Sequence, residues 1–434
     1  MVDQTTVVLA GVGGYGKMYL RHLLDAQKRG DAPHPFRIVG VADPRASTCD
    51  RYAEVRAANI PVYSSLEAFY ERHTADIAII ATPVQLHTRH ICLALSRGSH
   101  VLCEKPLASS YQDVSRVYHA RNAAGRHVAI GYQWSYCPAI RALKRDIASG
   151  LLGKPRRMRT LVLWPRGEEY FRRNPWAGRV RDDAGLLVLD SPLHNACAHF
   201  VHNAFHVLGE ALDARTLPSR VSAELYRAHA IENYDTAIVR CTIGENGSGV
   251  EAMFIASHAV PQRNGPVFCY EFEDATVTYD DAKMSEGIVA RFNNGEVKRY
   301  GVPATSDDPA KLWHIFECVR TGRAPICGIE AAYAQTACIL AAQESAPHIA
   351  SFDQSDVIVE KGEMGRLHYP MGLDRELAEC HRHFETPAER NLPWSRPGKV
   401  VIPKNPSEVL TAGVNGAKVR VHVKPHHAPA TAHL

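Results

Sequence analysis

The stretch VVLAGVGGYGKMYL, residues 7–20, decides the fold of this chain. It begins with a short apolar run and then places Gly11, Gly13 and Gly16 at G-x-G-x-x-G spacing. The apolar run predicts a strand, and the residues after the glycines have the spacing of a helix that Gly30 ends. In such a strand, turn and helix, Gly11 makes the tight turn, Gly13 lets the backbone approach a pyrophosphate, and Gly16 lets helix and strand pack closely.

Further apolar runs predict strands at 36–43, 76–83 and 100–106, with helical stretches between them. Each run is almost continuously apolar, which is typical of a parallel sheet covered by helices on both faces. Ligands bind outside the carboxyl ends of such strands. The sequence therefore predicts an N-terminal Rossmann dinucleotide-binding domain over 1–131.

Asp43 ends the second predicted strand and follows Gly16 by 27 residues, against about 20 in the usual dinucleotide-binding pattern. Its carboxylate is placed to accept hydrogen bonds from both adenosine ribose hydroxyls, and it would repel a 2′-phosphate. The pattern therefore predicts NAD as the cofactor and makes NADP the less favoured one, although Arg45 softens the discrimination. The alternative is that Asp43 only caps a turn before Pro44.

The pattern changes after the first domain. Alternating runs between residues 220 and 302, with hairpin turns at 244–249 and 293–296, predict a large, mainly antiparallel sheet. We therefore predict a C-terminal α+β domain over 132–385 that binds substrate and offers a flat sheet face to a second copy. Residues 386–434 are rich in Pro, Lys and His without periodicity, and are predicted to be an extended or partly disordered extension.

Composition and charge exclude several classes of protein. The 434 residues are 45% hydrophobic and 22% charged, as in a globular protein of two domains. The net charge of +4 is not gathered into a basic stripe, so no nucleic-acid partner is expected. No leader or bilayer-spanning run is visible, which predicts a cytoplasmic protein with no membrane partner. The 11 cysteines form no C-x-x-C pair, which argues against disulfides and a thiolate zinc site.

Three more stretches are informative together with the glycine loop: 81–108, which includes Glu-Lys-Pro at 104–106; DSPLH at 190–194; and IASGLLGKPRRM at 147–158. They resemble the glucose-fructose oxidoreductase, inositol dehydrogenase and rhizopine-catabolism family over roughly 7–346. The resemblance implies a nicotinamide-dependent oxidoreductase with a signature lysine and a signature Asp-x-x-x-His. It also implies a cis peptide bond between Lys105 and Pro106.

The chemistry follows from residue types. Removing a hydride from a secondary alcohol needs a base for the hydroxyl proton and positive charge near the oxygen. Lys105, at a strand's carboxyl end, offers that charge. His194 lies in the first turn of a helix predicted to begin after Ser191 and to end before Gly209, where the helix dipole favours neutral imidazole, so it is our preferred base. Asp190 is expected to orient that imidazole or bind a sugar hydroxyl; the alternative is a capping carboxylate.

Other side chains are weaker candidates. Trp164, Arg166 and Tyr170 suit a pocket wall that contacts substrate, or else packing at the sheet edge. A histidine series at helical spacing invites a zinc interpretation, but no cysteine or carboxylate completes a ligand set, so we predict no metal site and expect packing instead. The histidines of this series are His199, His202 and His206.

We predict an NAD-dependent oxidoreductase that transfers a hydride between a secondary alcohol of a sugar, cyclitol or related polyol and the nicotinamide, with Lys105, Asp190 and His194 as reacting groups. The alternatives are a glycosidase or lyase that recycles tightly bound NAD, and a cofactor-sensing protein without activity. The expected partners are the small-molecule substrate and further copies of the chain in a homodimer or homotetramer. The predicted cofactor contacts are Gly11, Gly13, Gly14, Tyr15, Gly16, Asp43, Arg45, Thr82, Pro83, His87, Glu104, Lys105 and Gln133.

Overall fold

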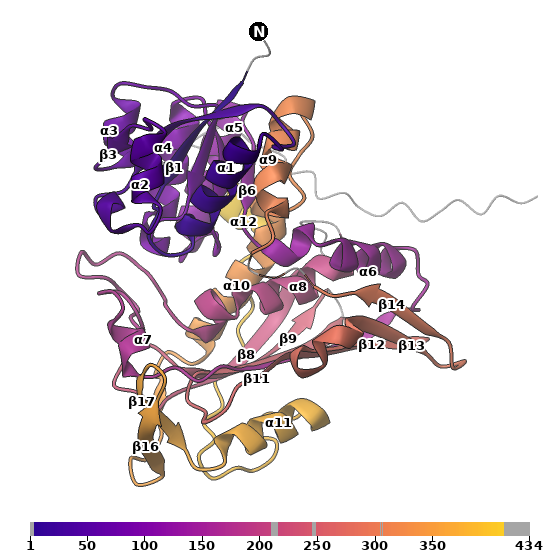
Figure 1. The fold of residues 1–434 in the computed structure, drawn as a ribbon. Coiled ribbons are helices and arrows are strands. Elements are labelled where there is room, and N and C mark those ends of the chain that lie inside the picture. Colours follow the sequence, from indigo (N-terminus) through magenta and orange to yellow (C-terminus); the bar gives the residue numbers. More distant parts are fainter. Residues whose placement is uncertain (1–3, 210–215, 245–248, 304, 306, 412–434) are drawn as a thin grey trace, which may run out of the picture.

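The computed structural model describes residues 4–209, 216–244, 249–303, 305 and 307–411, which form two domains (Figure 1). In the first domain, six of the described strands form a parallel sheet in the order β3-β2-β1-β4-β5-β6, which is the Rossmann order. The predicted Rossmann domain is confirmed; β3 and β6 add two strands too short to show periodicity. The strands are β1 (Thr5–Ala10), β2 (Phe36–Ala42), β3 (Val62–Tyr63), β4 (Ile77–Ile80), β5 (His100–Cys103) and β6 (Val128–Ile130).

Helices cover both faces of this sheet, which explains why its strands are apolar throughout. In β1, Val7 and Leu9 face a core shared with α1, whereas Val8 and Ala10 face a core shared with α4 and α5. Gly30 ends α1 in the left-handed conformation, with φ of 69°. The helices are α1 (Gly16–Arg29), α2 (Tyr52–Ala57), α3 (Leu66–Tyr70), α4 (His87–Ser96) and α5 (Tyr111–Ala124).

The second domain is built on a sheet in which nine described strands lie in the order β14-β13-β12-β11-β7-β10-β9-β8-β15. Its pairs are antiparallel except β7 with β10 and β8 with β15, so the predicted mainly antiparallel sheet is confirmed. The turn at 293–296 joins β13 to β14, whereas residues 245–248 of the other predicted hairpin turn lie outside the described residues. The strands are β7 (Pro155–Leu163), β8 (Pro218–Arg227), β9 (Thr236–Ile243), β10 (Val250–Ser257), β11 (Asn264–Phe272), β12 (Ala275–Asp280), β13 (Ile288–Phe292), β14 (Val297–Gly301) and β15 (Ala350–Ser351).

Two helices join the domains. Leu312 and Phe316 on α9 pack into the α1 side of the first domain. On α10, Ala332 and Ala337 belong to the α4 and α5 side of that domain, whereas Ala341 belongs to the core of the second. One end of α10 therefore lies in each domain. The helices of the second part are α6 (Pro138–Ala148), α7 (Glu168–Arg172), α8 (Ala198–Leu208), α9 (Ala310–Thr321) and α10 (Ile329–Ser345).

The C-terminal part covers the face of the large sheet that points away from the first domain (Figure 1). Strands β16 (Val357–Gly362) and β17 (Gly365–Pro370) and helix α11 (Leu373–His383) lie there. Leu377 on α11 packs with sheet residues such as Ile255 in one apolar cluster. The face expected to meet a second copy is therefore occupied by the chain itself.

The predicted C-terminal extension is described up to residue 411; residues 412–434 lie outside the described residues. Val401 forms a bridge with Val221 on β8, so the segment after Thr386 runs back along the sheet. It ends in α12 (Pro406–Thr411), which packs against α5. No helix among the described residues is long and apolar enough to cross a membrane.

Burial of His381 on α11 gives the fold a dependence on pH. The side chain is 8% exposed, and burial lowers its pKa to about 4. Because an unfolded histidine has a pKa of about 6.5, the unfolded chain gains a proton below that pH while the folded chain does not, so stability falls between about pH 6.5 and pH 4. We expect His381→Gln to remove up to about 1.4 kcal/mol of this loss per pH unit. Urea midpoints of the two proteins from pH 7.5 to 5 test this, and parallel curves would contradict it.

Candidate active site

A cavity of 990 Å³ lies at the carboxyl ends of the parallel strands and extends to the second domain. It brings most of the predicted site residues together. From the first domain it is lined by Gly11, Gly13, Gly14, Tyr15, Asp43, Arg45, Thr82, Pro83, His87, Glu104 and Lys105, and from the second by Tyr170, Asp190 and His194. Gly16, Gln133, Trp164 and Arg166 are not among the lining residues.

The glycine turn fits a dinucleotide pyrophosphate. Gly11 has a φ of 81°, which favours glycine. A Cβ atom built at Gly13 or Gly14 would meet nothing within 4 Å, so both open onto free space beside the helix N-terminus. A Cβ at Gly16 would lie 1.9 Å from the carbonyl oxygen of Gly11. The turn therefore offers its backbone to a ligand at Gly13 and Gly14, and Gly16 serves helix packing.

This division predicts different results for two alanine variants. Gly13→Ala is expected to keep the urea midpoint while weakening NAD binding by at least about tenfold, because its methyl group enters the space for the pyrophosphate. Gly16→Ala is expected to destabilise the fold by about 1–3 kcal/mol, because its Cβ clashes with the Gly11 backbone. Calorimetric NAD titration and urea unfolding of both variants test this. Equal affinity of Gly13→Ala and wild type would contradict it.

Asp43 holds the turn and keeps acceptor capacity for a ligand. Its Oδ2 accepts a hydrogen bond from the Val12 amide at 2.8 Å, and its Oδ1 accepts one from the Arg45 amide at 2.8 Å. The turn-capping alternative is thus observed. Each carboxylate oxygen has two lone pairs, so both can also accept a ribose hydroxyl. The two roles of Asp43 are compatible.

Lys105 is held at the boundary between the domains. The Lys105–Pro106 bond is cis, as the resemblance implies. The Lys105 ammonium donates to the carbonyl oxygen of Asn195 at 2.7 Å and to its Oδ1 at 3.1 Å. Burial lowers the pKa of Lys105 from its usual value of 10.5, and Glu104 opposes this shift. The ammonium is therefore fixed in the cavity by a residue of the second domain.

Glu104 is anchored by a buried lysine from α9. The Lys311 ammonium lies 2.5 Å from Glu104 Oε1, and the Tyr19 hydroxyl donates to the same oxygen at 2.6 Å. Burial opposes ionisation of Glu104, but Lys311 outweighs it and lowers the pKa of the carboxyl group. Lys311 is 1% exposed. The end of β5, which leads into Lys105, is therefore fixed by an ion pair with a residue 207 positions later in the sequence.

His194 is buried in the form of a neutral base. The predicted helix begins as a π-helical turn at Pro192–Ala196 and continues as α8 after Cys197. Ser109 Oγ donates to the Val188 carbonyl at 3.0 Å, so its single proton is used and it accepts from His194 Nε2 at 3.1 Å. Nδ1 then has a lone pair and no partner among the described residues. Burial, with Lys105 and His87, lowers the pKa of His194 to about 3.

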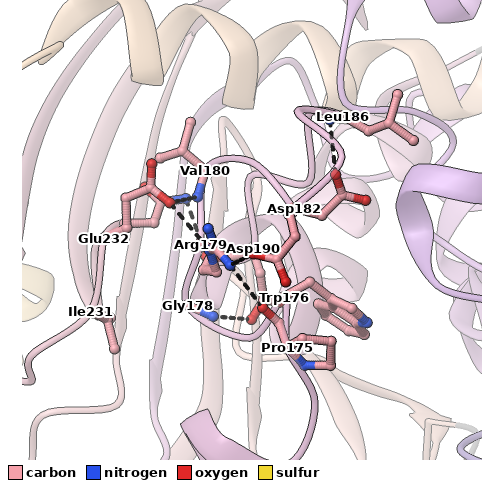
Figure 2. A network of polar contacts seen from close by, with 12 residues as sticks. Pro175, Trp176, Gly178, Arg179, Val180, Asp182, Leu186, Asp190, Ile231 and Glu232 are labelled. Carbon is pink, nitrogen blue, oxygen red and sulfur yellow. Dashed lines mark hydrogen bonds and ion pairs between the residues drawn. The ribbon is translucent and has the colours of Figure 1, made fainter.

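Asp190 contacts Asn195 where an imidazole contact was expected. Its Oδ1 accepts from Asn195 Nδ2 at 2.7 Å. Its Oδ2 accepts from the Gly178 amide at 2.7 Å, a contact that can be followed in Figure 2. The wide π-helical turn brings Asn195 back beside Asp190, whereas His194 Nε2 bonds to Ser109. Asp190 therefore orients the residue that holds Lys105.

Residues 5–132 match the family model described as an oxidoreductase family with an NAD-binding Rossmann fold. Over these residues the chain is therefore similar to the Gfo/Idh/MocA oxidoreductase family. Over 119 residues it is 34% identical to inositol 2-dehydrogenase 4 of Saccharopolyspora erythraea, covering 27% of this chain and 35% of the relative. Over 145 residues the chain is 27% identical to the rhizopine catabolism protein MocA of Rhizobium meliloti, covering 33% of this chain and 43% of the relative. The chain thus matches less than half the length of these relatives.

Solved structures extend the likeness to the second domain as a likeness of fold. The WlbA dehydrogenase from Bordetella pertussis, in complex with NADH and UDP-GlcNAcA, superposes with a TM-score of 0.63 at 20% identity, covering 85% of this chain and 100% of that one. An oxidoreductase from Agrobacterium radiobacter, in complex with NAD+, L-tartaric acid and magnesium, superposes with a TM-score of 0.62 at 17% identity. This match covers 80% of this chain and 97% of that one. The chain therefore shares the two-domain fold of these structures.

Besides Gly16, three residues predicted to contact ligand lie outside the cavity. The Trp164 indole donates to the Gly265 carbonyl at 2.8 Å, and the Arg166 guanidinium lies 4.8 Å from the centre of the Tyr170 ring. Arg166 thus packs on Tyr170, which does line the cavity, and the Trp164 ring packs edge to face on Phe200 at 5.7 Å. Gln133 begins the short helical turn that leads from β6 into α6, and this turn carries it away from the cavity.

The histidine series of α8 takes part in packing. His202 stacks on Tyr132 with ring centres 4.0 Å apart, and its Nε2 lies 2.9 Å from Ser135 Oγ. His206 stacks on His202 at 5.4 Å, and His199 meets Tyr132 edge to face at 5.9 Å. Within the part of the chain that the structure describes, no group of three His, Cys, Asp or Glu side chains is arranged to hold a metal ion.

The sequence analysis did not identify several residues that line the cavity. Asn195 directly follows His194, but only the π-helical turn brings it to Lys105. Arg173 and Trp176 lie close in sequence to Tyr170, in the run EEYFRRNPW of aromatic and arginine residues, which was the available signal. The remaining missed polar residues include Ser64, Ser65, Glu67, Arg89, His90 and Asn174.

Proposed function

We propose that this chain is an NAD-dependent oxidoreductase that transfers a hydride between a secondary alcohol of a sugar, cyclitol or related polyol and the nicotinamide. The observation that supports it most is that Lys105 and His194 line the same cavity as the glycine turn and Asp43. The names of relatives such as inositol 2-dehydrogenase 4 support the polyol class.

Each reacting group has a role in this proposal. NAD, held by the glycine turn and Asp43, supplies the hydride acceptor. The Lys105 ammonium stabilises negative charge on the substrate oxygen as its proton leaves. His194 accepts that proton at Nδ1, because its pKa of about 3 keeps the imidazole neutral at physiological pH. Asp190 orients Asn195, and Asn195 holds the ammonium.

A second candidate is a lyase or glycosidase that recycles tightly bound NAD. One relative, 30% identical over 118 residues, is named 2,7-anhydro-N-acetylneuraminate hydratase from Mediterraneibacter gnavus, and hydration involves no net redox change. The same side chains would serve a transient oxidation of the sugar ring. Only the fate of the reduced nicotinamide separates the two candidates.

The test mixes purified protein and added NAD with a panel of cyclitols, sugars and glycosides. Absorbance of the reduced nicotinamide and product mass are followed together. Stoichiometric NADH with a ketone product supports the dehydrogenase. Cleavage or hydration without NADH supports the second candidate, and NAD binding without any product contradicts both.

The preference for NAD over NADP is proposed to depend on the charge of Asp43. Asp43→Asn keeps the size of the side chain and a carbonyl acceptor but removes the charge that repels a 2′-phosphate. We expect the NAD to NADP affinity ratio to fall by about tenfold or more. Calorimetric titration of both dinucleotides tests it, with Asp50→Asn, an exposed carboxylate outside the cavity, as the control. An unchanged ratio in Asp43→Asn would contradict the assignment.

We also propose that the chain forms a homodimer or homotetramer, and the structure limits the surfaces through which the copies can meet. Because β16, β17 and α11 occupy the outer sheet face, a second copy is expected to use another surface. Light scattering after gel filtration measures the mass. Substitution of the exposed Val359 on β16 by Glu should leave that mass unchanged.

A further inference from the structure

Arg173 is a cation of the cavity wall that the proposed chemistry does not use. It directly follows α7 and lines the cavity. Its guanidinium lies 3.7 Å from the centre of the Tyr170 ring and 5.3 Å from that of Trp176. Its Nη1 donates to the Tyr170 carbonyl at 2.6 Å. The two aromatic rings fix the guanidinium plane, which is how arginine is usually held for planar recognition.

The positive charge of Arg173 is incompletely balanced. Its contact with Asp190 Oδ2, at 3.5 Å, is longer than the 2.7 Å bonds that Asp190 receives from Gly178 and Asn195. Two of the five guanidinium N–H groups thus have an acceptor among the described residues. The Lys105 ammonium adds a second cation nearby, while Glu104 is already paired with Lys311. The part of the cavity lined by Lys105, Arg173 and Asp190 therefore has an excess of positive charge.

The segment around Arg173 is held in place before any ligand binds. In the following loop, the Val180 amide donates to Glu232 Oε2 at 3.0 Å and the Leu186 amide donates to Asp182 Oδ1 at 2.9 Å (Figure 2). On α7, Glu168 is contacted by Arg366 at 2.8 Å and by His368 at 2.9 Å, both from β17. A guanidinium fixed in this way binds a matching anion at a low entropic cost.

We propose that the substrate of this site bears a carboxylate that Arg173 binds, so that the enzyme acts on sugar acids or carboxylated polyols. This inference rests on the proposed function. A guanidinium fork matches a carboxylate in a bidentate geometry, whereas a neutral polyol leaves its charge unbalanced. The contacts run from Arg173 through Asp190 and Asn195 to Lys105. The carboxylate therefore binds at one end of this chain of contacts and the reacting carbinol at the other.

The test compares matched probes on the wild type and three variants. The pairs are D-glucuronate with D-glucose and D-galacturonate with D-galactose, and D-glucose 6-phosphate is the competing anion. Arg173→Gln removes the charge, and Arg173→Lys keeps it without the fork. The control is Arg172→Gln, because Arg172 is 72% exposed, directly precedes Arg173 at the end of α7 and does not line the cavity. Binding to the protein–NADH complex by calorimetry and kcat/KM with NAD are both measured.

We expect the wild type and Arg172→Gln to favour the acid over its neutral partner by about 10- to 100-fold. In Arg173→Gln this ratio should fall toward one through a higher KM for the acid, with NADH affinity unchanged. In Arg173→Lys the preference for the acid should lie between that of the wild type and that of Arg173→Gln. Equal acid preference in Arg173→Gln and wild type, no acid preference, or tighter binding of the phosphate would overturn the inference. Acid binding that depends on Arg173 without any NADH formation would uphold it and contradict the proposed function.

Discussion

Lys105→Met is expected to lower kcat by about 10²- to 10⁴-fold, while NAD affinity stays within about twofold of the wild type. The half-buried ammonium donates to two oxygens of Asn195, and no other cation of the described residues makes these contacts. Methionine keeps the length of the side chain and the backbone amide, which donates to Glu104 Oε2 at 3.3 Å. Turnover assays and calorimetric NAD titration measure the two quantities.

Lys105→Arg is the conservative partner of this variant. It keeps the charge but spreads it over a planar fork, so it should recover part of kcat and no more. A Lys105→Met protein with more than a tenth of wild-type kcat would contradict the role of Lys105. A parallel loss of NAD affinity would instead assign the lysine to cofactor binding.

The second large effect is on stability. Lys311→Met leaves the Glu104 carboxylate buried without its counter-ion, and it is expected to destabilise the protein by about 3–5 kcal/mol. It also removes a cation 4.1 Å from the centre of the Tyr15 ring. Adding Glu104→Gln removes the uncompensated charge, so the double variant should be more stable than Lys311→Met alone. Urea unfolding of the four proteins of this cycle measures the coupling.

The measured coupling distinguishes two roles of Lys311 beside Glu104. If Lys311 mainly neutralises Glu104, the double variant regains stability and also a larger share of kcat, because the strand end bearing Lys105 returns to its position. If the two single substitutions have additive effects, the pair is not coupled and Lys311 acts only through packing. That result would contradict the anchoring role given to it.

The first domain was predictable because its signals are local. The glycine spacing and continuous apolar runs follow from backbone geometry and from burial on both sheet faces, and the cores on the two sides of β1 show this. The alternation in the second domain predicted its sheet for the same reason. Lys105, Asp190 and His194 came from motifs and a resemblance, and the structure brings them to one cavity.

The unpredicted features depend on contacts that are distant in sequence or on unusual backbone turns. Lys311 lies 207 residues from Glu104, and nothing local in α9 marks it as a partner. Asn195 reaches Lys105 only because of a π-helical turn, which has no simple sequence pattern. The sequence did not predict that α11 covers the large sheet. The apolar residues of an amphipathic helix show which side of the helix is buried, but not which surface of the protein that side will cover.

Hydride transfer from the substrate carbon to the nicotinamide can be followed with an isotope label. A polyol or sugar acid deuterated at its carbinol carbon is incubated with stoichiometric protein and NAD for a single turnover, and the dinucleotide is analysed by mass. We expect one deuterium on the reduced nicotinamide in the wild type and almost none in Lys105→Met. Product formation with all deuterium retained on carbon, and none ever present on the dinucleotide, would contradict it.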